Sequence, residues 1–144
     1  MAASRETILN ALFAQLSALA AFKLTSRRDR EPESIGPAQS PALFLVEPGE
    51  KYERPSIALP PKRTIRVDVI FYNDVGPEPN SIPLTIVNNA LDALDAALTP
   101  TSATYLNTLG GLVDVVYIDG EVEKRTGAKT GKAAAIVPIC IRLP

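Results

Sequence analysis

Apolar residues in the first part of the chain recur with the spacing of an amphipathic helix. In residues 4–23 they lie three and four positions apart, and they are Ile8, Leu9, Leu12, Phe13, Leu16, Leu19 and Ala20. Ser4 is a favourable N-cap, and Glu6 in the first turn suits the positive end of the helix dipole. The pattern therefore predicts a helix over residues 4–23.

The same spacing returns near residue 90. The apolar stripe there consists of Ile86, Val87, Ala90, Leu91, Leu94 and Leu98, and the polar positions between them include Asp92 and Asp95. Asn80 or Ser81 is the expected N-cap, and Pro83 is tolerated because it falls in the first turn. Residues 99–100 (Thr-Pro) should end this second helix.

Period-two alternation predicts strands elsewhere. In residues 63–72 the apolar positions 65, 67, 69 and 71 alternate with polar ones, as in a half-buried antiparallel strand. Residues 42–47 predict a short strand that Pro48-Gly49 stops, and residues 22–27 alternate weakly enough for another short strand.

The last third of the chain predicts a hairpin and a closing strand. Residues 112–118 and 121–126 flank Asp119-Gly120, a two-residue link that favours a type I′ turn. The final strand is expected over residues 133–143, where Pro138 favours an edge position or a bulge.

These elements predict the fold class. Two helices and about five or six mostly antiparallel strands, without βαβ alternation, indicate an α+β fold with both helices packed on one face of the sheet. The 144 residues suit a single domain over 1–144. Residues 27–41 carry charges and prolines with little to bury, which predicts a long mobile loop.

Composition limits the chemistry that is available. The chain has no histidine, so it lacks the commonest general base and the commonest neutral metal ligand. Its one cysteine excludes an internal disulfide and favours a reducing, intracellular setting. No apolar run approaches the ~20 residues that span a bilayer. The net charge of −1 gives no general argument for a nucleic-acid or anionic-membrane partner.

The candidate catalytic groups have simpler interpretations. Residues 127–132 (GAKTGK) resemble a phosphate loop, but the glycine spacing is wrong for a Walker A motif and Ala133 replaces its hydroxyl residue. Asp92 and Asp95 fall on the polar face of their helix, and Cys140 lies between two isoleucines without an activating base. We therefore expect no enzymatic activity, no cofactor and no metal.

Two clusters of basic residues are candidates for an interface. They are Arg27, Arg28 and Arg30 in the first cluster, and Lys124, Arg125, Lys129 and Lys132 in the second. One interpretation is ordinary solvated loop charge, and the other is contact with an anionic neighbour, either protein or DNA. Neither cluster carries the interleaved aromatic residues that single-strand binders use for stacking.

The order of elements resembles a known family. An amphipathic N-terminal helix, a long variable loop and the strand at 63–72 are followed by the Pro83-started helix. The segment from Leu109-Gly110-Gly111 to Asp119-Gly120 and a closing strand through residue 138 complete the series. This order resembles that of the tail terminator, or tail completion, proteins of tailed bacteriophages and related particles. The proline-rich stretch 32–61 departs from it.

The resemblance implies a structural role. Members of that family form a hexameric ring that caps the tail tube, stops its polymerisation and offers a docking surface to head-completion or connector proteins. DNA passes through the central channel only as cargo. The expected partners are further copies of the chain, the tail tube protein and the head-completion protein, without a membrane. The expected location is the virion, with the host cytoplasm during assembly. The alternatives are a head-closure or neck adaptor protein and, more remotely, a small phosphate-ligand-binding domain that uses residues 127–132.

Overall fold

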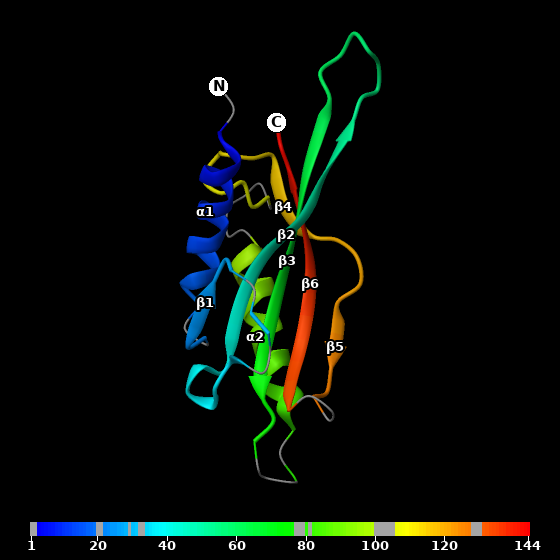
Figure 1. The fold of residues 1–144 in the computed structure, drawn as a ribbon. Coiled ribbons are helices and arrows are strands. Elements are labelled where there is room, and N and C mark those ends of the chain that lie inside the picture. Colours follow the sequence, from blue (N-terminus) through cyan, green and yellow to red (C-terminus); the bar gives the residue numbers. More distant parts are fainter. Residues whose placement is uncertain are drawn as a thin grey trace.

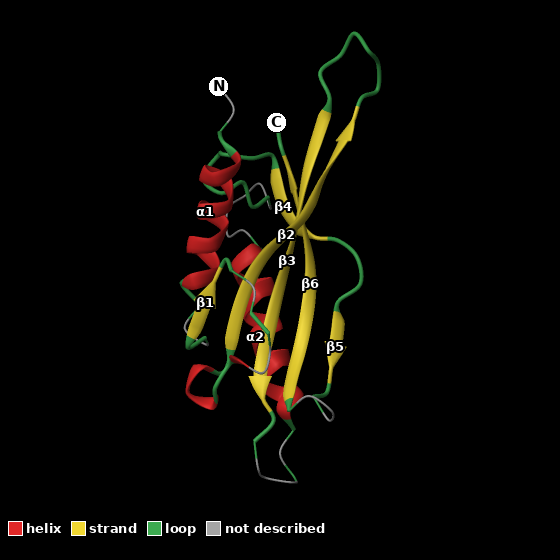
Figure 2. Ribbon diagram, in the orientation of Figure 1, coloured by secondary structure: helices red, strands yellow, loops and turns green. Residues whose placement is uncertain are grey.

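The structure is a computed structural model that describes residues 3–19, 22–28, 30–31, 34–76, 80, 82–99, 106–127 and 131–144. Its fold is α+β, with two α-helices and a curled, mostly antiparallel six-stranded sheet, as the sequence predicted (Figures 1 and 2). In chain order the elements are α1 (Arg5–Ser17), β1 (Leu24–Ser26), the 3-10 helix η2 (Pro37–Gln39), β2 (Ala42–Glu53), β3 (Lys62–Asp74), α2 (Pro83–Leu98), β4 (Val115–Ile118), β5 (Glu123–Arg125) and β6 (Lys132–Arg142).

The three long strands form the centre of the sheet. The strand order is β1-β2-β3-β6-β4, and β5 also pairs with β6. All pairs are antiparallel except β1 with β2, which run parallel. The short strand suggested by residues 22–27 is therefore confirmed as β1. No helix within the described ranges has the length and apolar character needed to cross a bilayer.

Both helices pack on the same face of the sheet, which confirms the predicted layering. The buried residues of the helices are Ile8, Leu9, Leu12 and Leu16 in α1, and Val87, Ala90, Leu94 and Leu98 in α2. Alternate residues of the long strands meet them, including Leu43, Leu45, Ile65, Val67, Val69, Phe71, Val137, Ile139 and Ile141. Each fully buried side chain of this size contributes about 1.5–3 kcal/mol.

The helix boundaries differ in part from the prediction. The Ser4 hydroxyl caps α1 by accepting from the Thr7 N–H at 3.2 Å, as expected. However, α1 ends at Ser17 with Ala18 as its C-cap, and the Lys23 N–H bonds the Pro41 carbonyl at 2.9 Å, next to the β1 pairing. In α2, Ile82 occupies the N-cap position without a side-chain cap, in place of the predicted residues 80 or 81. Ile86 was predicted to be buried but is 45% exposed.

The prediction that Pro48-Gly49 ends the second strand is wrong. The strand β2 continues to Glu53, with an irregular register between Val46 and Gly49 where Pro48 is accommodated. A bulge of this kind tolerates a proline because one residue leaves the hydrogen-bonded ladder. As a result, β2 and β3 extend together beyond the rest of the sheet (Figure 1).

The predicted Asp119-Gly120 hairpin is also wrong. Strands β4 and β5 do not pair with each other, and each pairs with a different part of β6. The reason lies at Pro138 of β6. Its carbonyl accepts a hydrogen bond from the Asp119 N–H at 3.1 Å, but its nitrogen, on the same side of the strand, has no proton to donate to the neighbouring chain. The neighbouring chain leaves the ladder there. Strand β6 is thus internal to the sheet, so the edge position expected for Pro138 is wrong.

Residues 34–44 give the sheet a second, smaller core on its other face. Ile35 is buried there with Ala42, Phe44 and Ile70, although the sequence suggested little to bury in residues 27–41. The Phe44 and Tyr72 rings meet edge to face, with centroids 5.8 Å apart. This packing covers one end of that face, and the other end, next to the extension of β2 and β3, contains a pocket.

Candidate assembly surfaces

The extension of β2 and β3 forms a projecting hairpin, here called the arm and defined as residues 50–65. Residues 50–53 pair with residues 62–65, and residues 54–61 form its tip. Arg5 of α1 contacts the Glu50 carboxylate and donates to the Tyr52 hydroxyl at 2.8 Å. The hydrogen bond from Arg5 holds the pKa of Glu50 below its usual value. The arm is therefore fastened to the first helix at its base.

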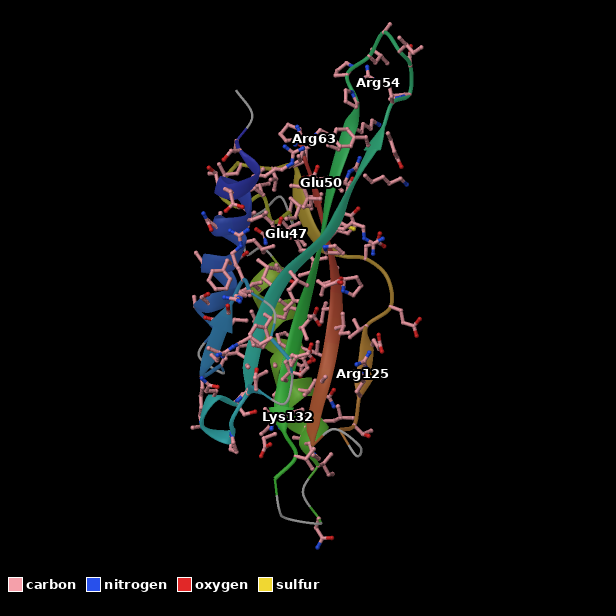
Figure 3. The ribbon with its side chains drawn as sticks, in the orientation of Figure 1. Glu47, Glu50, Arg54, Arg63, Arg125 and Lys132 are labelled. Carbon is pink, nitrogen blue, oxygen red and sulfur yellow. The ribbon has the colours of Figure 1, made fainter. Side chains whose placement is uncertain are left out.

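The tip of the arm is ordered by its own hydrogen bonds. Arg54 donates to the carbonyl oxygens of Ile57 at 3.4 Å and Leu59 at 3.0 Å, and Figure 3 shows Arg54 at the far end of the arm. The Ser56 hydroxyl accepts from the Ala58 N–H at 3.2 Å. These bonds present Ile57, which is 93% exposed, as an apolar projection. Because these bonds order the backbone of the tip, its docking would cost little backbone entropy.

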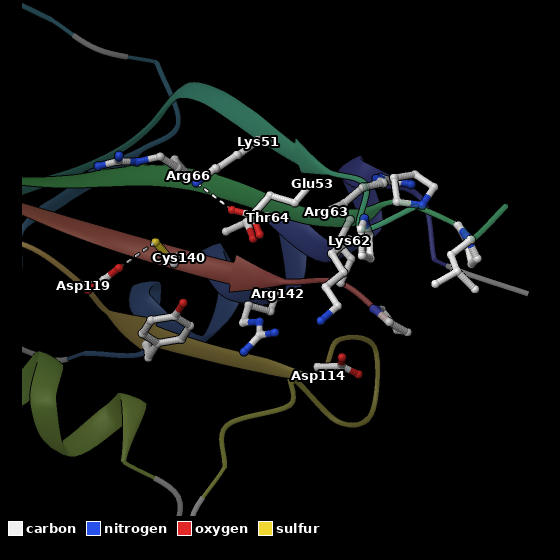
Figure 4. Close-up of a pocket in the computed structure, with 17 residues that line it drawn as sticks. Lys51, Glu53, Lys62, Arg63, Thr64, Arg66, Asp114, Asp119, Cys140 and Arg142 are labelled. Carbon is white, nitrogen blue, oxygen red and sulfur yellow. Dashed lines mark hydrogen bonds and ion pairs between the residues drawn. The ribbon is translucent and has the colours of Figure 1, made fainter. Parts of the chain in front are cut away.

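A pocket of about 650 Å³ lies at the base of the arm, on the face of the sheet opposite the helices (Figure 4). Its basic residues are Lys51, Lys62, Arg63, Arg66 and Arg142, and its acidic residues are Glu53, Asp114 and Asp119. Lys51 and Glu53 form an ion pair at 2.7 Å, whose hydrogen bond raises the pKa of Lys51 and lowers that of Glu53. The excess of positive charge suits an acidic protein surface.

Cys140 lies in the floor of this pocket. It is buried, and its thiol lies 3.9 Å from an Asp119 carboxylate oxygen. Burial raises the pKa of the Cys140 thiol, so it remains protonated at neutral pH and is a poor nucleophile. The sequence analysis found no activating base for Cys140, and its buried position agrees with that of a small apolar residue. In the part of the chain that the structure describes, no group of three or more His, Cys, Asp or Glu residues could hold a metal ion.

The first predicted basic cluster is divided by the structure. The Arg27 guanidinium donates to Glu6 at 2.8 and 3.2 Å, to Asn10 at 2.8 Å and to Glu47 at 2.7 Å, which ties α1 to the sheet. The hydrogen bonds that Arg27 donates to the Glu6 and Glu47 carboxylates raise its pKa. Arg28 and Arg30, in contrast, are exposed and line a pocket of about 660 Å³ beside β1.

The second predicted cluster is spread over both faces of the sheet. Lys124 donates to Asn88 of α2 at 2.9 Å, whereas Arg125 pairs with Glu123 at 3.0 Å on the opposite face of β5. Lys132 pairs with Asp74 at 2.5 Å. Figure 3 places Arg125 and Lys132 at the end of the sheet away from the arm. Lys129 lies outside the described residues. The structure therefore does not bring Lys124, Arg125 and Lys132, the described members of this cluster, together into one site.

The Gly127–Lys132 loop connects two antiparallel strands, as expected for an ordinary turn. The Gly131 N–H donates to the Gly127 carbonyl at 2.8 Å, which closes the connection between β5 and β6. Phosphate loops instead lead into a helix whose N-terminal N–H groups face the anion. With Lys132 paired to Asp74, this loop offers no such arrangement among its described residues.

A groove lies between α2 and the segment that joins β4 to β5, and it is here called the α2 groove. It encloses about 370 Å³, and its lining residues are Asn88, Leu91, Asp92, Asp95, Ile118, Val122, Lys124 and Val137. An adjacent hollow of about 460 Å³ shares Asp95 and Ile118 with it. Asp92 and Asp95 are exposed, as predicted, and they form an acidic rim over an apolar floor.

Sequence analysis missed the arm and the pocket at its base. The signal was present in the alternation of residues 62–66, where Lys62, Thr64 and Arg66 share one face of β3. Pro48-Gly49 predicts the end of a strand, so the sequence pattern does not align residues 50–53 with this face of β3. Comparison of the chain with protein-family models and with curated protein sequences gave no match. The case for a function therefore depends on these surfaces and on the order of the elements.

Proposed function

We propose that this protein is a structural component of a tailed phage or phage-like particle, where it forms a ring that caps the tail tube. The ring, hexameric in the family that the chain resembles, stops tube polymerisation and offers a docking surface to the head. The order of elements motivates this proposal. The observation that supports it best is the arm, which carries an ordered, exposed apolar tip away from the core.

Ring formation places a physical requirement on each subunit. A closed ring with one rotation axis uses heterologous interfaces, so every copy needs two different surfaces that fit each other. An arm fastened at its base by Arg5 and Glu50 is a suitable first surface, because it can reach a neighbour without changing the core. Side chains exposed beyond the core, such as Ile57, gain burial only through such a contact.

The basic pocket at the base of the arm belongs to a protein contact in this proposal. Fixed positive charge along a DNA channel would bind phosphates and slow the passage of the genome. Lys62, Arg66 and Arg142 are therefore assigned to the face that meets acidic side chains of the tube protein or of the head-completion protein. No catalytic step or cofactor has a part in this function.

The test is to mix the purified protein with assembling tail tube protein and to image the product by electron microscopy. The proposal predicts a single ring at one end of each tube and tubes that stop growing. Native mass spectrometry of the ring then gives the number of subunits. Tubes whose ends remain bare and whose lengths are unchanged would contradict the proposal.

Imaging of complete particles that carry the protein separates the alternatives. A ring found at the portal, and absent from the tube end, would assign the protein as a head-closure or neck adaptor. For a phosphate-ligand-binding domain, millimolar ATP or GTP should raise the melting temperature, and Lys132→Ala should remove that rise. The pairing of Lys132 with Asp74 argues against this last function.

A further inference from the structure

The structure assigns a specific contact between copies of this chain: the tip of the arm of one copy docks in the α2 groove of the next. This inference rests on the proposed ring and names the interface that would build it. The occupant of the groove is thus a second copy of the chain, and the anchoring side chain is Ile57.

The arm supplies an anchor that is ready to bind. Ile57 is 93% exposed, and the hydrogen bonds of Arg54 and Ser56 to the surrounding backbone hold the loop that carries it. Residues 55, 60 and 61 are prolines, which further restrict the tip. An exposed apolar side chain on an ordered loop can serve as an interface anchor if the partner offers a pocket that buries it.

The α2 groove offers a matching receptor. Its floor is apolar, with Leu91, Ile118 and Val122 half-buried and Val137 buried. Its volume of about 370 Å³ lies within the range of pockets that bind compact ligands. An isoleucine side chain that enters it exchanges water for apolar contacts with the floor of the groove, which favours binding.

Charge complementarity favours a second copy as the occupant. The tip of the arm, residues 54–61, contains one basic residue, Arg54, and no acidic residue. The helix α2 contains two acidic residues, Asp92 and Asp95, and no basic residue. Both aspartates lie on the rim of the groove, although Lys124 on the opposite rim offsets part of their charge. Opposite charges around an apolar anchor steer the arm into the groove and fix its orientation.

The arm and the groove are different surfaces of the chain, so this contact is heterologous. Each copy gives its arm to one neighbour and its groove to the other, and a closing rotation produces a ring. In Figure 1 the arm extends away from the body that contains α2, β4 and β5. Loss of either surface must therefore prevent the ring. A copy without a functional arm and a copy without a functional groove can still form one contact, between the intact groove of the first and the intact arm of the second.

Three variants test this contact directly. Ile57→Asp removes the anchor, and the double variant Asp92→Lys/Asp95→Lys reverses the rim. Ile82→Asp is the matched control, because Ile82 is another exposed isoleucine, at 70%, that does not line the groove. All substituted side chains are exposed, so the variants should fold, which circular dichroism checks. Association is measured by sedimentation velocity and native mass spectrometry.

We expect Ile57→Asp and the aspartate double variant each to associate at least ~30-fold more weakly than wild type, the effect of losing an interface hot spot. Ile82→Asp should match wild type. The equimolar mixture of the two interface variants should give a one-to-one dimer and nothing larger. Wild-type assembly by either interface variant, or failure of the mixture to form the dimer, would overturn the inference.

Disulfide trapping decides the case if wild type assembles only on tubes. Ile57→Cys is mixed with isotope-labelled Asp92→Cys. In the control reaction, Ile82→Cys takes the place of Ile57→Cys. A mixed dimer identified by mass, in excess over the control, supports the contact. No excess overturns it. If Ile57→Asp still caps tubes, the proposed contact between arm and groove is wrong, but the proposed function stands. If the mixed dimer forms but the wild-type protein leaves tube ends bare, the proposed function is wrong, but the contact stands.

Discussion

Replacing Arg27 by glutamine is expected to destabilise the monomer without directly removing an interface. The Arg27 guanidinium joins Glu6 and Asn10 of α1 to Glu47 of β2 through four hydrogen bonds of 2.7–3.2 Å. Its side chain is only 24% exposed, which places it between the helix and the sheet. The shorter neutral amide of glutamine cannot reach all three acceptors.

The magnitude follows from the exposure of the partners. A hydrogen bond to a charged group contributes about 1.5–3 kcal/mol when it is shielded from water. Glu6 is 70% exposed and Glu47 43% exposed, so solvent screens most of the pairing. We therefore expect Arg27→Gln to lower the free energy of unfolding by about 2 kcal/mol. For a domain of this size that corresponds to a Tm lower by roughly 4–8 °C.

The assay is thermal unfolding followed by circular dichroism, with Arg28→Gln as the matched control. Arg28 is exposed beside β1, so its replacement should change the free energy of unfolding by less than ~0.5 kcal/mol. The reasoning is refuted if Arg27→Gln and Arg28→Gln have the same Tm. If Arg27→Gln then also abolished self-association, Arg27 would be an interface residue, as the sequence analysis allowed.

Three further predictions concern the fold. In urea unfolding, Gly127→Ala should lower the free energy of unfolding several-fold more than Gly131→Ala. Both glycines have a positive φ, 79° and 77°, but of the two only Gly127 would bring an added Cβ against backbone atoms, at 2.5 Å. Equal effects of the two substitutions would contradict this steric argument. Glu50, whose pKa is lowered by the hydrogen bond from Arg5, should stabilise the fold fully above about pH 4.3 and lose that effect as the pH falls through its lowered pKa. The decrease in Tm between about pH 6 and about pH 3 should thus be smaller in Glu50→Gln, and an unchanged profile would count against this pair. Leu12→Ala should reduce the free energy of unfolding by about 2–5 kcal/mol, since Leu12 is fully buried, and a loss below ~1 kcal/mol would contradict its place in the core.

Local patterns in the sequence were sufficient to predict the layers of the fold. Apolar spacing identified both helices, and the alternation of residues 63–72 identified the central strand β3 together with the face that meets the helices. The N-cap at Ser4 followed from short-range chemistry alone. These features depend on residues close in sequence, so no knowledge of tertiary contacts was needed.

The errors arose where a distant partner decides the local structure. Pro48-Gly49 normally ends a strand, but pairing with β3 carries β2 past it through a bulge. Asp119-Gly120 normally forms a hairpin turn, but β6 offers both flanking segments a longer partner and Pro138 interrupts the ladder between them. Arg27 could not be separated from Arg28 because its acceptors, Glu6 and Glu47, lie about twenty positions away on either side.

The measurement that tests the account most directly is electron microscopy of tail tubes assembled with and without this protein. The account predicts tubes that end in one ring of this chain, and it predicts that Ile57→Asp leaves those ends bare. Tubes that grow to the same length in the presence of the wild-type protein, with no additional density at either end, would contradict it.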